Sequence, residues 1–323
     1  MTFRGIIPLI MAAAAFPAAA QPSLTPPIDC ALGETCHIQN FVDTDPTEGA
    51  VDFACGTLSY NAHKGTDFGL ASLKAMTSGV DVLASAPGVV RATRDGMPDK
   101  VFTPQDEADI AGRDCGNGVV IQHKDGWETQ YCHLRQGSVV VSQGMQVAAG
   151  DKLGLVGLSG RTQFPHVHLS VRHNGQIIDP FSPQAKPGQC GLTNDDTLWS
   201  DPAPTYVPGG LISAGFAPGL PDYADVKAGT AHRAELIATT PALVLWVMGF
   251  GSRAGDTLEM TITGPAGAIF QTTVNLDKPQ AQYFRATGKR LRAALPPGLY
   301  RGEITLLRDG APIDTAVSSV QIR

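Results

Sequence analysis

The sequence predicts a β-rich protein of two domains, an antiparallel-sheet domain followed by an immunoglobulin-like β-sandwich. Its 323 residues exceed what one hydrophobic core usually supports. The 36 glycines and 24 prolines divide the chain into short apolar runs, which favour short strands over long helices. A Pro- and Gly-rich stretch at 183–211 separates two sets of such runs and is typical of a linker. We therefore predict the all-β class.

The first twenty residues have the pattern of a cleaved secretory signal. Arg4 precedes an apolar stretch at 6–16, and Ala18-Ala19-Ala20 has the small-residue pattern of a cleavage site. The apolar stretch is shorter than the roughly 20 residues that span a bilayer, so we predict no transmembrane anchor. Before Cys30 stands Pro26-Pro27-Ile28-Asp29, which lacks the small residues of a lipoprotein signal. We predict an exported protein, periplasmic or secreted.

Residues 21–50 and 51–182 differ in pattern. The first segment is acidic, contains proline and lacks periodicity, so we expect it to wrap the first domain. The second has strand patterns and hairpin turns at 124–126 and 174–175. We expect the polar stretch between Asp95 and Cys115 to be a surface loop that shapes a groove. The expected strands are Val80 to Ala84, Gly88 to Ala92, Gly118 to His123, Glu128 to His133, Lys152 to Val156 and Val167 to Arg172.

Residues 212–323 are expected to form the second domain. This part contains no cysteine, so only the sandwich architecture is predicted and not the disulfide-bearing variety. It has no obvious aromatic cluster that would indicate a binding surface, and its protein partner stays open. The expected strands are Ala234 to Thr239, Ala242 to Met248, Leu258 to Ile262, Ile269 to Val274, Leu299 to Leu306 and Ala316 to Ile322.

Six cysteines occur, all before residue 191, and in an exported chain an even number favours disulfides over thiolate metal ligands. No Cys-x-x-Cys spacing is present, which argues against a redox or structural zinc motif. All fifteen pairings stay open at this point. The disulfide candidates are Cys30, Cys36, Cys55, Cys115, Cys132 and Cys190.

The formal net charge of −6 argues against a nucleic-acid partner, and no run of Lys or Arg opposes that reading. We predict no nucleic-acid binding.

Three short strings carry side chains suited to zinc chemistry. They are His63-Lys64-Gly65-Thr66-Asp67, Tyr131-Cys132-His133 and His166-Val167-His168. Zinc in hydrolases takes three protein ligands and keeps a fourth position for water, whose pKa falls to about 7. The strings supply three ligands and leave two histidines over.

Each string also has an ordinary structural reading. A His and an Asp four residues apart are structural or solvated in most proteins, and the glycine at position 65 favours an irregular strand or loop over a helix. His166 and His168 are more specific, because residues i and i+2 of a strand project from one face. By that parity Ser170 and Arg172 share their face, whereas His173 points away.

Other histidines have no comparable neighbours. His37, His123 and His232 are expected to be structural or solvated, and His133 taken alone could be a buried core histidine.

Together the strings resemble the lysostaphin and LytM family of zinc metallopeptidases, over roughly Thr57 to Phe181. These peptidases show His-x-x-x-Asp, then a His after an aromatic strand, then His-x-His. The resemblance extends to Ala86-Pro87-Gly88-Val89-Val90, Gly116-Asn117-Gly118-Val119-Val120-Ile121, Val147-Ala148-Ala149-Gly150-Asp151, Gly157-Leu158-Ser159-Gly160-Arg161-Thr162 and Asp179-Pro180.

The resemblance implies a compact LytM-type domain at 51–182 and assigns roles within it. His63, Asp67 and His168 would hold one zinc ion, and His133 and His166 would be the catalytic histidines. It further implies a bacterial zinc metalloendopeptidase whose substrate is peptidoglycan. The division of proton transfer between the two histidines stays open.

Two features depart from the family, the long segment between Arg94 and Cys115 and the cysteines at 115 and 132. They bear on substrate preference more than on the metal site, because they replace none of the five residues. Two alternative functions stay open. One is a non-catalytic wall-binding or amidase-activating protein, whose relatives typically lack some ligands; the other is a secreted protease of Gly-rich protein.

Overall fold

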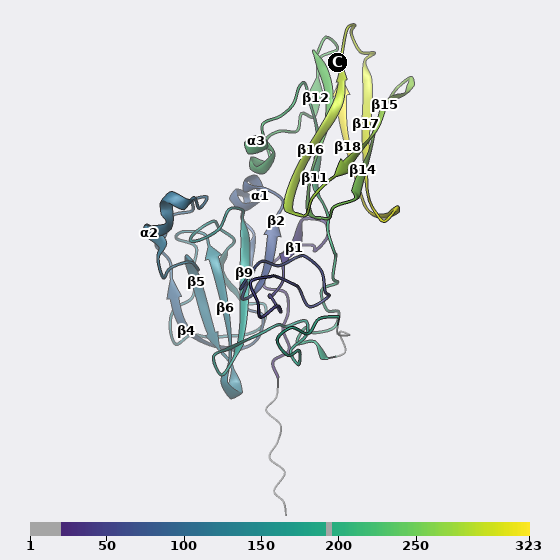
Figure 1. Ribbon diagram of the computed structural model, residues 1–323. Helices are drawn as coiled ribbons and strands as arrows, with labels where there is room; N and C mark the ends of the chain where they lie inside the picture. The colour runs from purple at the N-terminus through teal and green to yellow at the C-terminus, as the bar shows by residue number, and fades with distance from the viewer. Residues whose placement is uncertain (1–20, 192–195) are drawn as a thin grey trace, which may run out of the picture.

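The computed structural model describes residues 21–191 and 196–323. Figure 1 shows two strand-rich bodies that follow one another along the chain. The prediction of a β-rich protein built from antiparallel sheets is confirmed. The signal predicted over 1–20 lies outside the described residues. Among the described residues, no helix combines the length and the apolar character that crossing a bilayer requires.

The first body is built on an eight-stranded sheet in the order β1-β2-β9-β6-β5-β4-β7, with β10 paired to β9. All its pairings are antiparallel, and a separate antiparallel pair, β3 and β8, accompanies it. The strands are β1 (Cys36–Asn40), β2 (Thr66–Leu70), β3 (Asp81–Leu83), β4 (Gly88–Arg94), β5 (Asn117–Gln122), β6 (Trp127–Leu134), β7 (Gln146–Val147), β8 (Lys152–Leu155), β9 (His166–His173) and β10 (Gln176–Ile178).

Strand β9 shows why this sheet positions a polar site. Val167, Leu169 and Val171 are almost fully buried in the core, whereas His168 and Ser170 project from the opposite face. The parity predicted from the sequence is thus confirmed. Because β9 lies between β2 and β6, its polar face carries side chains next to those of both neighbours.

The segment expected only to wrap this domain also contributes an edge strand. Strand β1 pairs with β2, and its five residues are all buried. It lacks an alternating pattern because both of its faces are covered, so periodicity could not reveal it.

Short helical pieces complete the first body. They are α1 (Leu73–Ser78), α2 (Glu107–Ile110) and the 3₁₀ turns η1 (Pro104–Asp106) and η2 (Lys124–Gly126). Both η1 and α2 lie in the polar stretch that was expected to be a loop.

The second body consists of two sheets with a common hydrophobic core. Its three-stranded sheet has the order β11-β13-β16, and its five-stranded sheet the order β12-β18-β17-β14-β15. Phe216 and Leu245 from one sheet share the core with Met260 and Ile304 from the other. The elements are β11 (Gly210–Ala217), α3 (Tyr223–Ala228), β12 (Glu235–Leu236), β13 (Ala242–Ser252), β14 (Asp256–Gly264), β15 (Gly267–Leu276), β16 (Gln280–Arg290), β17 (Gly298–Arg308) and β18 (Ala311–Ile322).

This arrangement is a two-sheet packing, and its immunoglobulin-like character stays a prediction. Strands β11 and β16 had no counterpart among the expected strands. Strand β11 is rich in glycine and alanine, and β16 is largely polar and half-buried, so neither has a strong apolar alternation.

The expected linker packs against the first core. Trp199 belongs to that core and Tyr206 packs on it, and Phe250 of β13 joins it from the second body. The two bodies are therefore in contact through apolar side chains as well as through the chain itself. We retain 51–182, 183–211 and 212–323 as the proposed division of the chain.

The six cysteines form three disulfides, as the even number in an exported chain predicts. The pairs are Cys30–Cys36, Cys55–Cys190 and Cys115–Cys132. The second joins the first domain to the expected linker at Cys190, and the third joins the residue before His133 to Cys115, two residues before β5. No cysteine of the described residues is left unpaired.

Candidate metal centre

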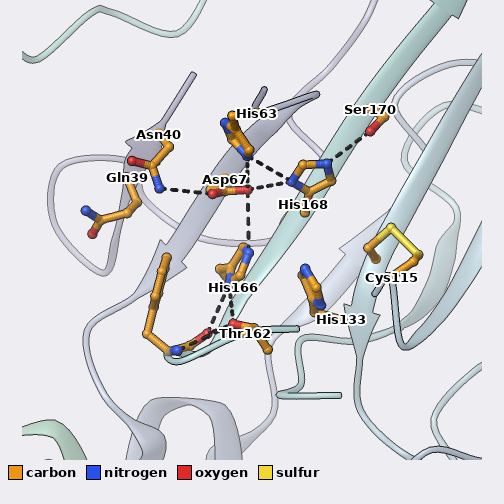
Figure 2. A network of polar contacts seen from close by, with 12 residues as sticks. Gln39, Asn40, His63, Asp67, Cys115, His133, Thr162, His166, His168 and Ser170 are labelled. Carbon is orange, nitrogen blue, oxygen red and sulfur yellow. Dashed lines mark hydrogen bonds and ion pairs between the residues drawn. A yellow bond between two sulfur atoms is a disulfide. The ribbon is translucent and has the colours of Figure 1, made fainter. Parts of the chain in front are cut away.

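Side chains from two adjacent strands and from the segment that precedes one of them converge on one face of the sheet (Figure 2). His63 lies just before β2, Asp67 is on β2 and His168 is on β9. Asp67 and His168 are register partners in the antiparallel β2·β9 pair. Gly65 allows the chain to pass close to β9, because a Cβ at this position would lie 2.5 Å from both His168 Nε2 and the Leu169 carbonyl oxygen.

The three side chains present one donor atom each to a common point. His63 Nε2 lies 3.2 Å from Asp67 Oδ1 and 3.2 Å from His168 Nδ1, and His168 Nδ1 lies 2.7 Å from Asp67 Oδ1. Tetrahedral zinc bonds of about 2.0–2.2 Å require ligand atoms about 3.3 Å apart. Two imidazoles and one carboxylate at this spacing therefore fit zinc in both chemistry and size.

The other polar atom of each ligand is already engaged. His63 Nδ1 lies 2.7 Å from the Phe41 carbonyl oxygen, so it carries the proton and leaves Nε2 as a lone-pair donor. His168 Nε2 lies 3.0 Å from Ser170 Oγ. We assign the proton to Nε2, which leaves Nδ1 free for metal.

The carboxylate of Asp67 is oriented in the same way. Asn40 Nδ2 donates to Asp67 Oδ2 at 3.1 Å, which leaves Oδ1 to face the two imidazoles. Asn40, Phe41 and Ser170 thus hold the three ligands from behind, an arrangement expected of a metal site.

Charge and burial act together on these groups. Burial alone would raise the pKa of Asp67, but the adjacent His63 and His166 hold that pKa well below its usual range. Burial lowers the pKa of His168 and favours its neutral form, which is the form that binds metal. In the metal-free chain burial opposes protonation of His63, yet the neighbouring Asp67 carboxylate raises its pKa.

His133 lies beside the three ligands, and its ring centroid is 6.1 Å from that of His168. Its Nδ1 is 2.8 Å from the Ser159 carbonyl oxygen, so the proton is on Nδ1 and Nε2 is an acceptor. Burial, followed by the nearby His166 and His168, holds the pKa of His133 well below its usual range. The neutral imidazole is the form suited to accept a proton.

The backbone at His133 is held in an uncommon conformation. Its φ is 63°, which is in the left-handed region, and its backbone N–H donates to the Cys115 carbonyl oxygen at 2.8 Å. The disulfide between Cys115 and Cys132 lies directly beside this contact. It therefore fixes the segment that carries the histidine.

His166 lies next to His133 at the centre. Its Nδ1 lies 3.0 Å from the Phe164 carbonyl oxygen and 3.1 Å from Thr162 Oγ1, while the Phe164 ring stacks on the imidazole at 4.4 Å. Its Nε2 points to the centre, 3.5 Å from Asp67 Oδ1. The His133 and His166 rings are 4.6 Å apart, so both face the same small volume.

The remaining histidines of the described residues lie elsewhere. His173 stacks on Trp127 at 4.4 Å, which matches its predicted place on the other face of β9. His123 contacts Thr129 and the Pro87 carbonyl, and His232 lies beside Phe216 of β11. His37 lies on β1 and contacts Gln39 at 2.9 Å, and burial lowers its pKa to about 4.

The supporting residues were largely missed by the sequence reading. Asn40 lies in the segment without periodicity, and Ser159 and Thr162 lie in a Gly-containing loop. Only Ser170 had a usable signal, because it shares the face of His166 and His168 on the strand.

The five predicted residues come together, and the comparisons with known proteins are consistent with this. Residues 61–180 match the model described as Peptidase family M23. Over these 120 residues the chain is similar to peptidase family M23. The resemblance to lysostaphin and LytM peptidases is thereby confirmed, and the M23 domain is a metallopeptidase domain, as predicted.

Two curated relatives are similar to about a third of the chain. One is the DD-carboxypeptidase/endopeptidase Mpg of Neisseria meningitidis serogroup B, 39% identical over 107 residues, which is 32% of this chain and 22% of the relative. The other is the peptidoglycan DD-endopeptidase ShyA of Vibrio cholerae, 34% identical over 117 residues, or 36% of this chain and 22% of the relative. The chain thus spans about a fifth of the length of these relatives.

Solved structures resemble part of the chain as well. The catalytic domain of the M23 protein EnpA from Enterococcus faecalis is 20% identical, covers 51% of this chain and 98% of its own, and has a TM-score of 0.33. The catalytic domain of lysostaphin from Staphylococcus simulans is 23% identical and covers 37% of this chain and 77% of its own, with a TM-score of 0.28.

Proposed function

We propose that the protein is an exported zinc-dependent endopeptidase that hydrolyses an amide bond in peptidoglycan peptides. One observation carries the proposal. Three donor atoms, on His63, Asp67 and His168, converge at 2.7–3.2 Å, and the other polar atom of each is held by a separate partner. Such preorganisation is unnecessary for a purely structural cluster, and it suits a metal ion.

The proposed ligands are His63, Asp67 and His168. A zinc ion held by them would supply Lewis-acid chemistry that activates water for attack near neutral pH. With two neutral imidazoles and one carboxylate as ligands, a bound divalent ion would keep a net positive charge, which would also favour polarisation of a substrate carbonyl.

His133 and His166 are proposed to handle the protons. Both have Nδ1 bound to a backbone carbonyl and Nε2 directed to the centre, so either can accept a proton from water or donate to a developing oxyanion. The low pKa of His133 favours its neutral form and hence the acceptor role. We propose that the pair divides these two roles.

Peptidoglycan as substrate is supported by the relatives. ShyA is named a peptidoglycan DD-endopeptidase, and Mpg is named a DD-carboxypeptidase/endopeptidase. Three disulfides support an exported, oxidising location.

Two alternatives carry different expectations. A wall-binding or amidase-activating protein would not need the complete set of two histidines beside three ligands. A protease of Gly-rich protein would need the same centre and differ only in substrate.

Cleavage assays with purified peptidoglycan and with a Gly-rich protein, each with and without chelator, test the proposal. We expect chelator-sensitive cleavage of peptidoglycan, restored by zinc, with products whose masses identify the bond. Chelator-sensitive cleavage of the protein alone would favour the protease. Absence of cleavage of both would favour the binding protein.

A further inference from the structure

The second domain forms one side of the cleft that contains the candidate metal centre. The cleft has a volume of about 650 Å³ and contains Asp67, His133 and His166 from the first domain. The opposite side comes from α3, through Tyr223 and Lys227, and from the segment entering β16, residues 278–282. In Figure 1, α3 is drawn at the end of the second domain that faces the first domain, on the same side as α1.

Hydrogen bonds between the domains hold this side in place. Gln39 of β1 is fully buried; its Nε2 donates to the Ala281 carbonyl oxygen at 2.6 Å, and its Oε1 accepts from Gln282 Nε2 at 3.1 Å. The His37 and Phe250 rings lie 4.6 Å apart in the same interface. Since Gln39 precedes Asn40, the residue that holds Asp67, one strand supports both the centre and the opposite wall.

The charges that line the cleft are unequal. Its described lining contains one carboxylate, the proposed metal ligand Asp67, and three cations, Arg161, Lys227 and Lys278. Arg161 is bound to Glu107 and Asp114. Neither Lys227 nor Lys278 has a carboxylate within salt-bridge distance among the described residues.

The ammonium group of Lys227 lies over an aromatic ring of the same helix. Its Nζ lies 5.0 Å from the centroid of the Tyr223 ring, and both residues line the cleft. The carboxylates next to these lysines, Asp222, Asp225 and Asp277, do not line it. With a divalent cation at the centre the cleft is cationic, although the whole chain has a net charge of −6.

We propose that the second domain is part of the substrate-binding site, where Lys227 and Lys278 bind the free carboxylates of an acidic peptide while its amide bond lies at the metal centre. The inference rests on the proposed function for the identity of the reaction. It adds that the second domain takes part in substrate binding. It also adds that the substrate is negatively charged on the side of the scissile bond that faces the second domain. Salt screening should weaken the contact, because both ammonium groups are partly or fully exposed.

The test compares Lys227→Met/Lys278→Met with wild type and with Lys289→Met. Methionine keeps most of the aliphatic length and removes the charge. Lys289 is an exposed lysine of strand β16 that does not line the cleft, so it is a matched control. The substrates are a cross-linked acidic stem peptide and the same peptide with its carboxylates amidated. Zinc content and the thermal unfolding midpoint are measured for every variant.

For the acidic peptide we expect KM to rise about three- to tenfold in the double variant with kcat within twofold, since two exposed ion pairs are removed. For the amidated peptide, and for Lys289→Met, we expect no change. Affinity for both peptides is also measured by calorimetry in a His133→Ala background. If wild type cleaves neither peptide, the proposed function fails, while the affinities still decide the inference.

Two results would overturn the inference. One is equal KM and affinity of the double variant and wild type for the acidic peptide. The other is an equal loss for the acidic and the amidated peptide, which would indicate a general effect on the cleft and not recognition of carboxylates.

Discussion

His168 and Asp67 face each other across strands β9 and β2, with Nδ1 of the histidine 2.7 Å from Oδ1 of the aspartate. His63 Nε2 completes the group at 3.2 Å from each atom. The register of one strand pair thus brings together two ligands that are 101 positions apart in the sequence.

Replacing His168 should remove the metal and the activity together. In His168→Ala two donor atoms are left, and we expect bound zinc to fall from one ion per chain to background, with no measurable hydrolysis. Elemental analysis after dialysis checks this. His173→Ala is the control, because His173 lies on the same strand and stacks on Trp127 away from the centre. Full zinc content in His168→Ala would contradict the ligand assignment.

Replacing Asn40 should weaken zinc binding without removing a ligand. Loss of the Asn40 hydrogen bond leaves Asp67 Oδ2 unsupported, and such supporting partners contribute about 10- to 100-fold in affinity. We expect that range for Asn40→Ala in competition with a zinc chelator. Asn275→Ala, an exposed asparagine of β15, should bind zinc as wild type does. Unchanged affinity in Asn40→Ala would show that Asp67 needs no such support.

Replacing His133 should separate binding from turnover. His133→Ala keeps all three ligands, so we expect normal zinc content and a fall in kcat of about 10²- to 10⁴-fold, the usual contribution of a general acid or base. Because φ at this residue is 63°, His133→Asn is a second variant whose side chain tolerates the left-handed conformation. Normal hydrolysis by either variant would refute the catalytic role.

The buried Asp179 should make stability fall as the pH rises. Burial, with the nearby Asp52, raises the pKa of Asp179 to about 7 in the folded chain, above the usual 3.8. Between pH 4 and 7 the folded state keeps a proton that the unfolded state has lost. The stabilising effect of this proton is complete below about pH 4, and it is lost as the pH rises to about 7.

Denaturant unfolding of chelator-treated Asp179→Asn and wild type at pH 4.5, 6 and 8 checks this dependence. Asparagine keeps the acceptor for the Phe181 N–H, which Asp179 Oδ1 provides at 2.9 Å, but cannot ionise. We expect the variant to gain stability relative to wild type as the pH increases. A constant difference between the two proteins at all three pH values would contradict the prediction.

Removing the Cys115–Cys132 disulfide should impair catalysis as well as stability. Its 17-residue separation predicts a loss of about 3 kcal/mol of unfolding free energy in Cys115→Ser/Cys132→Ser. Because the Cys115 carbonyl holds the His133 N–H, kcat should also fall. Cys30→Ser/Cys36→Ser, which is remote from His133 in sequence and pairing, should keep kcat. Equal kcat in both variants would remove the positioning role.

The local patterns of the sequence carried much of the prediction. Short apolar runs and turn residues indicated strands β4, β5, β6 and β9, because each of these has an alternating or apolar pattern of its own. The spacing of His166 and His168 determined that the two share a face, because the side-chain period of a strand is 2. Strands β1, β11 and β16 lacked such a pattern and were missed.

The sequence by itself determined which side chains are available for zinc and proton transfer, because residue type and strand parity are local properties. Only the tertiary structure decided what surrounds them. Asn40 and Phe41 reach the centre through the pairing of β1 with β2, and Lys227 and Lys278 reach the cleft through the packing of the second domain. Such contacts depend on register and domain packing between distant segments, for which a single sequence has no periodic signal.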